Sequence, residues 1–205
     1  MKKLIVAVTI ALVLLATQAF GGAYGNMMLG AKAGVNIASF HGDDVVNGKS
    51  IVGFVGGGFV ELPINDMISF QPEVLYTMKG GKETEGGDLE VTWNLSYIEI
   101  PMLFKAYLPM APTVKPHIYF GPEVAFRVSG TWEWEEFGET VEEDVEDVSN
   151  TDIGLVFGGG IAFPAMAHMF SLEARYDLGL TTIDDEDDPW DIKNGVFSIL
   201  AGISF

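Results

Sequence analysis

The last ten residues of the chain alternate between apolar side chains and mostly small or polar ones, and this constrains the fold more than any other feature. Counting back from the carboxy-terminal residue, the apolar positions are Phe205, Ile203, Ala201, Ile199 and Phe197. The positions between them are Ser204, Gly202, Leu200 and Ser198. Alternation with a period of two predicts a β-strand with one apolar face and one polar face.

Eight segments read as strands of the length that a tilted membrane strand needs. They are residues 29–40, 51–62, 68–78, 91–107, 115–129, 152–163, 169–180 and 196–205. The connections between them alternate in length. Three are short, at residues 63–66, 109–114 and 164–168, and four are long and polar, at residues 41–50, 79–90, 130–150 and 181–194. This pattern predicts an all-β fold, an eight-stranded antiparallel up-and-down transmembrane β-barrel with short periplasmic turns and longer external loops.

One predicted strand, at residues 91–107, changes phase along its length. Its apolar residues from Ile98 to Phe104 lie on one face, but those from Val91 to Leu95 lie on the other. A β-bulge near Ser96 would reconcile the two halves, and so would a first half that projects above the membrane. The sequence leaves both explanations open.

The chain starts with Met1, Lys2 and Lys3, followed by an apolar run and then small residues. A basic start and a short apolar run predict a cleaved secretory signal peptide, because the run is too short to span a membrane as a helix. We therefore expect residues 1–22 to be removed and residues 23–205 to form one barrel domain. An amino-terminal membrane anchor is the alternative.

The composition fits an exported membrane barrel. Hydrophobic residues make up 48% of the chain, yet beyond the start they are spread over short segments. The chain has no cysteine, so an exported domain of this size needs another source of stability, which a closed hydrogen-bonded barrel provides. The formal charge of −18 argues against a nucleic-acid partner, because phosphate repels it.

The predicted inward faces carry charges of both signs. The candidates are Lys32, Glu73, Glu99, Lys105, Glu123, Arg127, Glu173, Arg175 and Asp177, with Glu61 as a further one. An eight-stranded barrel is only wide enough for side chains. These charges therefore predict an ion-pair network that fills the interior, since pairing offsets the cost of burying each charge. The alternative is a proton or ion path, which would make the protein a narrow cation-selective pore.

The long connections hold most of the acidic residues. Residues 130–150 include nine Asp or Glu and no Lys or Arg. In the last connection, Asp184, Asp185, Asp187 and Asp188 are candidate ligands for a divalent cation, although their spacing is not that of an EF-hand. A solvated, repulsive surface is the alternative. Trp132, Trp134 and Trp190 lie in or beside these connections, and they suit either an external binding surface or an aromatic girdle.

Little in the sequence suggests catalysis. The three histidines, His41, His117 and His168, are scattered, and no nucleophile, phosphate-binding or zinc motif accompanies them. We expect neither an enzyme nor a bound cofactor.

Several short motifs follow one another along the chain: GAKAGVN at residues 30–36, QPEVLY at 71–76, KG at 79–80, YIEIP at 97–101, GP at 121–122 and ARYDLGL at 174–180. Together they resemble the PorT-like or "porin family" small outer-membrane β-barrel proteins. The resemblance covers nearly the whole mature chain and implies an eight-stranded barrel in the outer membrane of a diderm bacterium. It implies no reaction or ligand, because fold does not determine function. The acidic segment 130–150 is not part of the shared pattern.

The expected partners follow from this placement. They are outer-membrane lipid, divalent cations at the external loops, and the barrel-assembly machinery, because a terminal Phe205 resembles the assembly signal that this machinery reads. The expected role is structural or surface interaction, which includes an external adhesin. A soluble lipocalin-like barrel is a further alternative, and it would turn the apolar face inward around a ligand.

Overall fold

The computed structural model describes residues 27–43, 45, 48–85, 89–109, 113–136, 139–144, 148–184 and 190–205, which form nine β-strands. The strands are β1 (Met28–His41), β2 (Ile51–Pro63), β3 (Ile68–Glu85), β4 (Leu89–Tyr107), β5 (Lys115–Glu136), β6 (Glu139–Asp144), β7 (Thr151–Ala165), β8 (His168–Gly179) and β9 (Lys193–Ser204). In this part of the chain no helix is both long and apolar enough to cross a membrane. The predicted signal peptide, residues 1–22, lies outside the described residues.

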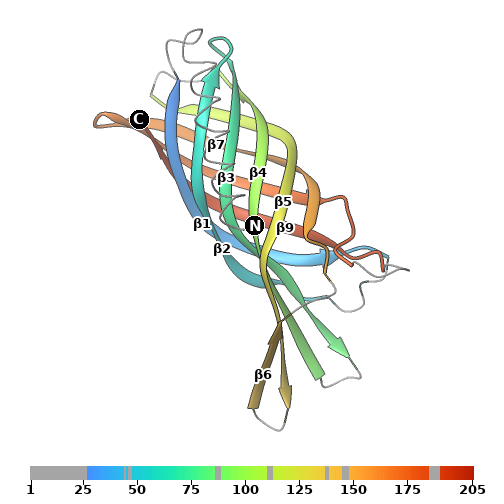
Figure 1. Cartoon of the computed structure of the whole chain (residues 1–205). Helices are drawn as coiled ribbons and strands as arrows, with labels where there is room; N and C mark the ends of the chain where they lie inside the picture. The colour runs from blue at the N-terminus through green and yellow to red at the C-terminus, as the bar shows by residue number, and fades with distance from the viewer. Residues whose placement is uncertain are drawn as a thin grey trace.

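Eight of the nine strands close into a ring of antiparallel pairs in the order β1-β2-β3-β4-β5-β7-β8-β9 (Figure 1). The first and last strands close it, with Val35 of β1 opposite Ile199 of β9. The remaining strand, β6, pairs with β5. The predicted eight-stranded antiparallel barrel is confirmed. A closed ring leaves no strand edge within the membrane, where an unpaired backbone group would be costly.

The connections at one end of the barrel are short, as predicted. Residues 64–67 join β2 to β3, and the Asn65 Oδ1 accepts hydrogen bonds from the backbone N–H groups of Met67 and Ile68, each at 2.9 Å. Between β7 and β8 lies a turn of two residues, Met166 and Ala167. Met166 has a φ of 57°, a left-handed conformation that a two-residue hairpin turn of this kind requires.

At the other end, the prediction of loops at residues 79–90 and 130–150 is wrong for most of their length. Strand β3 continues to Glu85, β4 begins at Leu89, β5 continues to Glu136 and β6 follows. Residues 79–85, 89–95, 130–136 and 139–144 therefore form a four-stranded sheet, here called the extension, which projects below the barrel in Figure 1. Acidic residues suggested a loop, but alternate valine and tryptophan residues supply the β-propensity that a strand needs.

A register shift marks the junction between the barrel and the extension. Ser96 of β4 lies opposite Ser129, but Tyr97 lies opposite Arg127, so β5 has one additional residue, Val128, at this point. The β4 strand itself keeps its phase through the junction, because Leu95, Tyr97 and Glu99 are all buried. Both explanations of the phase change contribute: the start of β4 projects beyond the barrel, and a bulge lies beside Ser96 on the neighbouring strand.

The apolar face of the barrel points outward. Val52, Phe54 and Phe120 on this face are 78%, 49% and 66% exposed, whereas charged residues on the alternate face are buried. This orientation suits a lipid environment. The lipocalin-like alternative, which needs an apolar interior, is therefore wrong.

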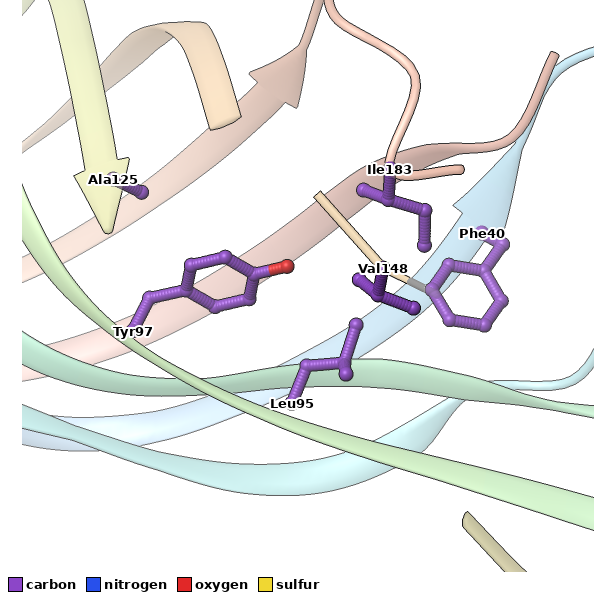
Figure 2. Packing of buried hydrophobic residues seen from close by; sticks show 6 residues of the cluster. All are labelled: Phe40, Leu95, Tyr97, Ala125, Val148 and Ile183. Carbon is purple, nitrogen blue, oxygen red and sulfur yellow. The ribbon is translucent and has the colours of Figure 1, made fainter. Parts of the chain in front are cut away.

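Buried apolar side chains close the barrel at the end that carries the extension. The cluster, which we call the apolar cap, consists of Phe40, Leu95, Tyr97, Ala125, Val148 and Ile183 (Figure 2). It includes Val148 and Ile183 from the long connections, so these connections fold over the barrel mouth. Gly81 leaves room for the cap, because a Cβ at that position would lie 2.8 Å from the ring of Phe40.

Candidate functional site

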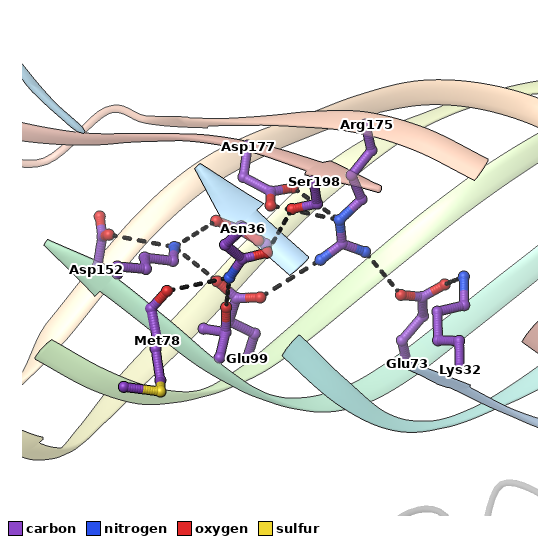
Figure 3. A network of polar contacts seen from close by, with 12 residues as sticks. Lys32, Asn36, Glu73, Met78, Glu99, Asp152, Arg175, Asp177 and Ser198 are labelled. Carbon is purple, nitrogen blue, oxygen red and sulfur yellow. Dashed lines mark hydrogen bonds and ion pairs between the residues drawn. The ribbon is translucent and has the colours of Figure 1, made fainter. Parts of the chain in front are cut away.

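Arg175 lies at the centre of the barrel interior and joins three strands (Figure 3). Its Nη1 is 2.9 Å from Glu73 Oε2 on β3, its Nη2 is 3.4 Å from Glu99 Oε2 on β4, and its Nε is 3.1 Å from Asp177 Oδ1 on its own strand, β8. The side chains of Arg175, Glu73 and Glu99 are 0% exposed. The sequence brings these groups together because each occupies an inward position of its strand.

Two lysines continue the network towards the end with short turns. The Lys32 Nζ lies between Glu73, at 2.7 Å, and Glu173, at 2.8 Å. The Lys105 Nζ is held more loosely, 3.5 Å from Glu61 and 3.7 Å from Glu173. This half of the network therefore links β1, β2, β3, β4 and β8 through charged groups.

Lys79 organises the other half, and sequence reasoning missed it. Its Nζ is 2.7 Å from Glu99, 3.2 Å from Glu123 and 3.7 Å from Asp152, and its side chain is 1% exposed. The predicted network includes neither Lys79 nor Asp152, and Lys79 falls in the loop predicted at residues 79–90. The period of two could have found Lys79, since it continues the inward series of Glu73 and the residues after it.

Uncharged side chains complete the connections across the barrel. Asn36 on β1 donates from Nδ2 to Thr77 Oγ1 on β3, at 2.8 Å, and accepts at Oδ1 from Ser198 Oγ on β9, at 2.7 Å. Asn194 donates from Nδ2 to Asp152 Oδ2, at 2.9 Å. These hydrogen bonds satisfy polar groups that burial would otherwise leave without a partner.

The described interior holds more acidic than basic side chains. The seven carboxylates are Glu61, Glu73, Glu99, Glu123, Asp152, Glu173 and Asp177, and the four cations are Lys32, Lys79, Lys105 and Arg175. Each of these residues is at most 3% exposed. These charged side chains are therefore enclosed by protein, and the predicted ion-pair network in the interior is present.

A cavity remains at the end with short turns. Its volume is about 600 Å³, and its lining includes Phe59, Lys105, Tyr107 and Phe170. Tyr107 donates a hydrogen bond to Glu61 Oε1 at 2.8 Å and so helps to fix the inner wall. The network thus closes the barrel above an open vestibule.

Other predicted site residues lie elsewhere. Arg127 donates from Nη2 to the Val148 carbonyl at 2.6 Å and so ties a long connection to the barrel wall. Asp184 Oδ2 accepts from the Trp190 backbone N–H at 2.8 Å. The other candidate metal ligands, Asp185, Asp187 and Asp188, lie outside the described residues. Among the residues that are described, no group of three or more His, Asp or Glu side chains could hold a metal ion.

The histidines are dispersed in the structure too. His117 is buried in the network, with its Nε2 3.3 Å from Glu173 Oε1. His168 packs edge-on against the ring of Phe205, with ring centroids 4.9 Å apart. The Phe205 backbone N–H donates to the Leu29 carbonyl at 2.8 Å, which places the carboxy-terminus beside β1.

The extension carries a row of indole rings. Trp93 on β4 stacks against Trp132 on β5 with ring centroids 6.0 Å apart, and Trp132 lies 4.4 Å from Trp134. On the opposite face, Asn94 donates to Glu133 Oε1 at 3.0 Å. This aromatic arrangement adds packing energy beyond simple burial, and it keeps three large side chains in fixed positions outside the barrel.

The last connection is polar and exposed. The Lys193 ammonium donates a hydrogen bond to the carboxylate of Asp191. This bond lowers the pKa of the Asp191 carboxyl from its ordinary value. Asp191 is therefore ionised and forms an ion pair with Lys193 outside the barrel.

A closed ring of eight antiparallel strands with an apolar outside and an ion-paired inside defines a small transmembrane β-barrel. The profile of the family described as "Outer membrane protein beta-barrel domain" matches residues 18–185, and the chain belongs to this family. The protein is therefore an integral protein of the outer membrane of a Gram-negative bacterium.

Several solved structures are similar to the chain at low sequence identity. A major outer membrane protein from Thermus thermophilus has a TM-score of 0.52 and 11% identity, over 88% of this chain and 100% of that one. Neisserial surface protein A has a TM-score of 0.48 and 17% identity, over 86% and 97%. Ail of Yersinia pestis, in complex with the heparin analogue sucrose octasulfate, has a TM-score of 0.46 and 16% identity, over 88% and 99%. No curated protein matches the chain.

Proposed function

We propose that this protein is a non-conducting barrel whose task is to hold the extension outside the cell as an interaction surface. The buried ion-pair network carries the proposal. Arg175 joins Glu73 and Glu99 across the barrel with side chains that are 0% exposed, which supports an interior without a water-filled path. The apolar cap and the extension then lie beyond the closed interior, where only the external face is open to partners.

Conductance in planar lipid bilayers tests this function. We expect a silent bilayer from protein whose insertion is established by its heat-dependent shift in electrophoresis, with a known porin as the conducting control. Steady channels in protein that shows this shift would exclude a closed barrel.

A narrow cation-selective pore is the second candidate, and one observation favours it. Seven buried carboxylates face only four buried cations in the described interior, a balance that attracts cations. This candidate predicts small single channels that pass potassium in preference to chloride. Replacing Lys79 with methionine would then raise the preference for cations, since it removes a positive charge from the path.

Three partners complete the proposal. Outer-membrane lipid surrounds the apolar outer face, and Phe205 is the contact for the barrel-assembly machinery, supported by its exposed position at the end of β9. Divalent cations at the acidic connections are the third. Calcium-dependent protection of residues 130–150 from protease tests this last partner, and equal digestion with calcium and with chelator would exclude it.

The finer classification is also a proposal. Within its family, we place the chain with the PorT-like barrels, supported by the motifs at residues 30–36, 71–76 and 174–180. We propose a role without catalysis, supported by the position of His117 in a buried ion-pair network rather than at an accessible surface. A cleaved signal peptide over residues 1–22 remains a prediction, and mass spectrometry of the membrane-extracted protein tests it.

A further inference from the structure

The indole row of the extension lies on a sheet face that no described strand covers. Trp93, Trp132 and Trp134 share this face, because Trp93 and Trp132 are opposite each other in register and Trp134 is two residues further along β5. This face of the extension continues the inner face of the barrel. The strands on the far side of the ring do not continue with it, since β1 ends at His41 and β9 begins at Lys193.

The row is held rigidly at its base. Trp93 packs against the apolar cap, and its stacking on Trp132 fixes the next ring. All three indoles are half-buried, so each keeps part of its surface open to solvent. A partner would therefore meet aromatic surface that is already ordered, at a low cost in side-chain entropy.

The charge around the row is negative. Glu143 on β6 lies opposite Trp132 in register and is exposed. Residues 130–150 include nine acidic residues and no Lys or Arg, although Glu133 itself lies on the opposite face of the sheet. An anionic partner would be repelled, and the negatively charged surface of the same membrane would be too. Indole faces attract cations, especially when carboxylates accompany them.

We propose that the tryptophan face of the extension binds a lysine- or arginine-rich segment of a partner polypeptide. Cationic side chains of the partner contact the indole surface of Trp132 and Trp134 that stays open to solvent, and carboxylates such as Glu143 neutralise them. The inference rests on the proposed function, because it requires an extension that stands free outside the membrane. It adds the chemistry of the partner, which the fold alone leaves open.

Binding of short peptides to the full-length protein in lipid nanodiscs tests the proposal. The probes are fluorescently labelled hexalysine and hexaarginine, with hexaglutamate as the charge-reversed probe, and the readout is fluorescence anisotropy at physiological salt. We expect both basic peptides to bind and hexaglutamate not to bind. The Trp132→Leu and Trp134→Leu variants should each weaken binding by roughly 2- to 30-fold, the range expected for loss of a cation–π contact, and Glu143→Gln should also weaken it.

The matched control is Trp190→Leu, because Trp190 is an exposed indole on the same side of the membrane but outside the row. We expect this variant to bind as tightly as the wild type. Each variant must keep its heat-dependent electrophoretic shift, which separates a lost contact from a misfolded barrel.

Two results would overturn the proposal. The first is peptide binding that Trp132→Leu and Trp134→Leu leave unchanged, because the binding would then come from the general negative charge of the surface. The second is the absence of hexalysine and hexaarginine binding. Failure of the proposed function is distinguishable from failure of this inference. It would appear as conductance in bilayers or as an extension that protease cannot reach, whatever the result with the peptides.

Discussion

Arg175 illustrates what a buried charge does in this molecule. It contacts carboxylates from β3, β4 and β8 at distances between 2.9 and 3.4 Å. Burying such groups costs solvation energy that their pairing only partly offsets, so the network is weak evidence for extra stability. Its clearer consequence is specificity, since a strand paired out of register would leave its inward charge without a partner.

Replacing Arg175 with methionine should lower the free energy of unfolding by about 3–5 kcal/mol, because Glu73, Glu99 and Asp177 would lose a shared buried partner. Urea unfolding in lipid vesicles measures this change. Lys193→Met is the control, since it removes a lysine from a more exposed pair and should have little effect. An Arg175→Met barrel as stable as the wild type would show that the carboxylates find other partners.

Met166 offers a prediction of the opposite sign. Its φ of 57° is unfavourable for a residue with a Cβ, and asparagine tolerates this conformation better. Met166→Asn should therefore raise the free energy of unfolding by about 1 kcal/mol. Met166→Val should lower it, because a β-branched side chain fits this conformation poorly. Equal unfolding midpoints in urea for the two variants would contradict the argument.

The sequence predicted most of the inward charges in segments of regular alternation, although it missed Asp152. Glu73, Glu99 and Arg175 each stand among apolar neighbours on the opposite face, so their phase is clear. Lys79 was missed because the acidic residues that follow it suggested a loop. Its partners Glu99 and Glu123 come from other strands, and a single sequence does not encode which strands face each other across a barrel.

At the scale of elements, the extension shows that strands of a membrane barrel can continue as a sheet beyond the barrel. Strands β3 to β6 keep pairing beyond the barrel, with the bulge at Val128 adjusting β5 to its neighbour. The alternation of Val91, Trp93 and Leu95 already indicated that the strand continues into the extension. Charge was taken as the sign of a loop, although a charged face is compatible with a strand that stands in water.

Gly80 lies where β3 enters the extension, in a conformation that favours glycine. Its φ is 135°, and a Cβ there would lie 2.0 Å from the Trp93 carbonyl oxygen. Gly80→Ala should therefore disturb the pairing of β3 with β4 and expose the extension to protease, while the barrel keeps its electrophoretic shift.

Gly58→Ala is the matched control for this substitution. A Cβ at Gly58 would lie 3.5 Å from its nearest neighbour, an ordinary contact. Limited proteolysis followed by mass spectrometry compares the two variants. If Gly80→Ala is digested as slowly as Gly58→Ala, the close approach to Trp93 is relieved without loss of pairing.

The terminal residue provides a prediction about β9. Phe205 is 64% exposed, and its backbone bonds to Leu29 of β1. Deleting it should reduce the yield of barrel inserted by reconstituted assembly machinery, while spontaneous folding into detergent micelles should change little. Equal yields from the assembly machinery would show that the side chain is not read.

At the scale of the whole molecule, the barrel places its polar and apolar faces in the opposite way to a soluble barrel. Large apolar side chains face outward and ionised ones face inward, so lipid supplies the apolar environment that a core supplies elsewhere. Alternation and connection lengths predicted this architecture, because both follow from local sequence. Alternation alone does not tell which face of a strand points into the barrel. The signal-like start of the chain, which indicates export, was needed to predict that the apolar face points outward.

The closed architecture predicts a difference between cold and boiled samples in electrophoresis. Protein extracted from the membrane fraction should migrate as a compact band when cold and as an extended chain after boiling, because a ring without edges resists detergent unfolding. Identical migration of the two samples would contradict a closed barrel.

The pairing of the first strand with the last also sets the order of events in folding. Ser198 on β9 bonds to Asn36 on β1 across 162 residues of sequence, so this contact has a long loop to close and forms late. Until β9 arrives, β1 presents an open edge and an apolar face to its surroundings, a state that is prone to aggregation. The chain is therefore open to aggregation for as long as β9 is unpaired, whatever the stability of the finished barrel.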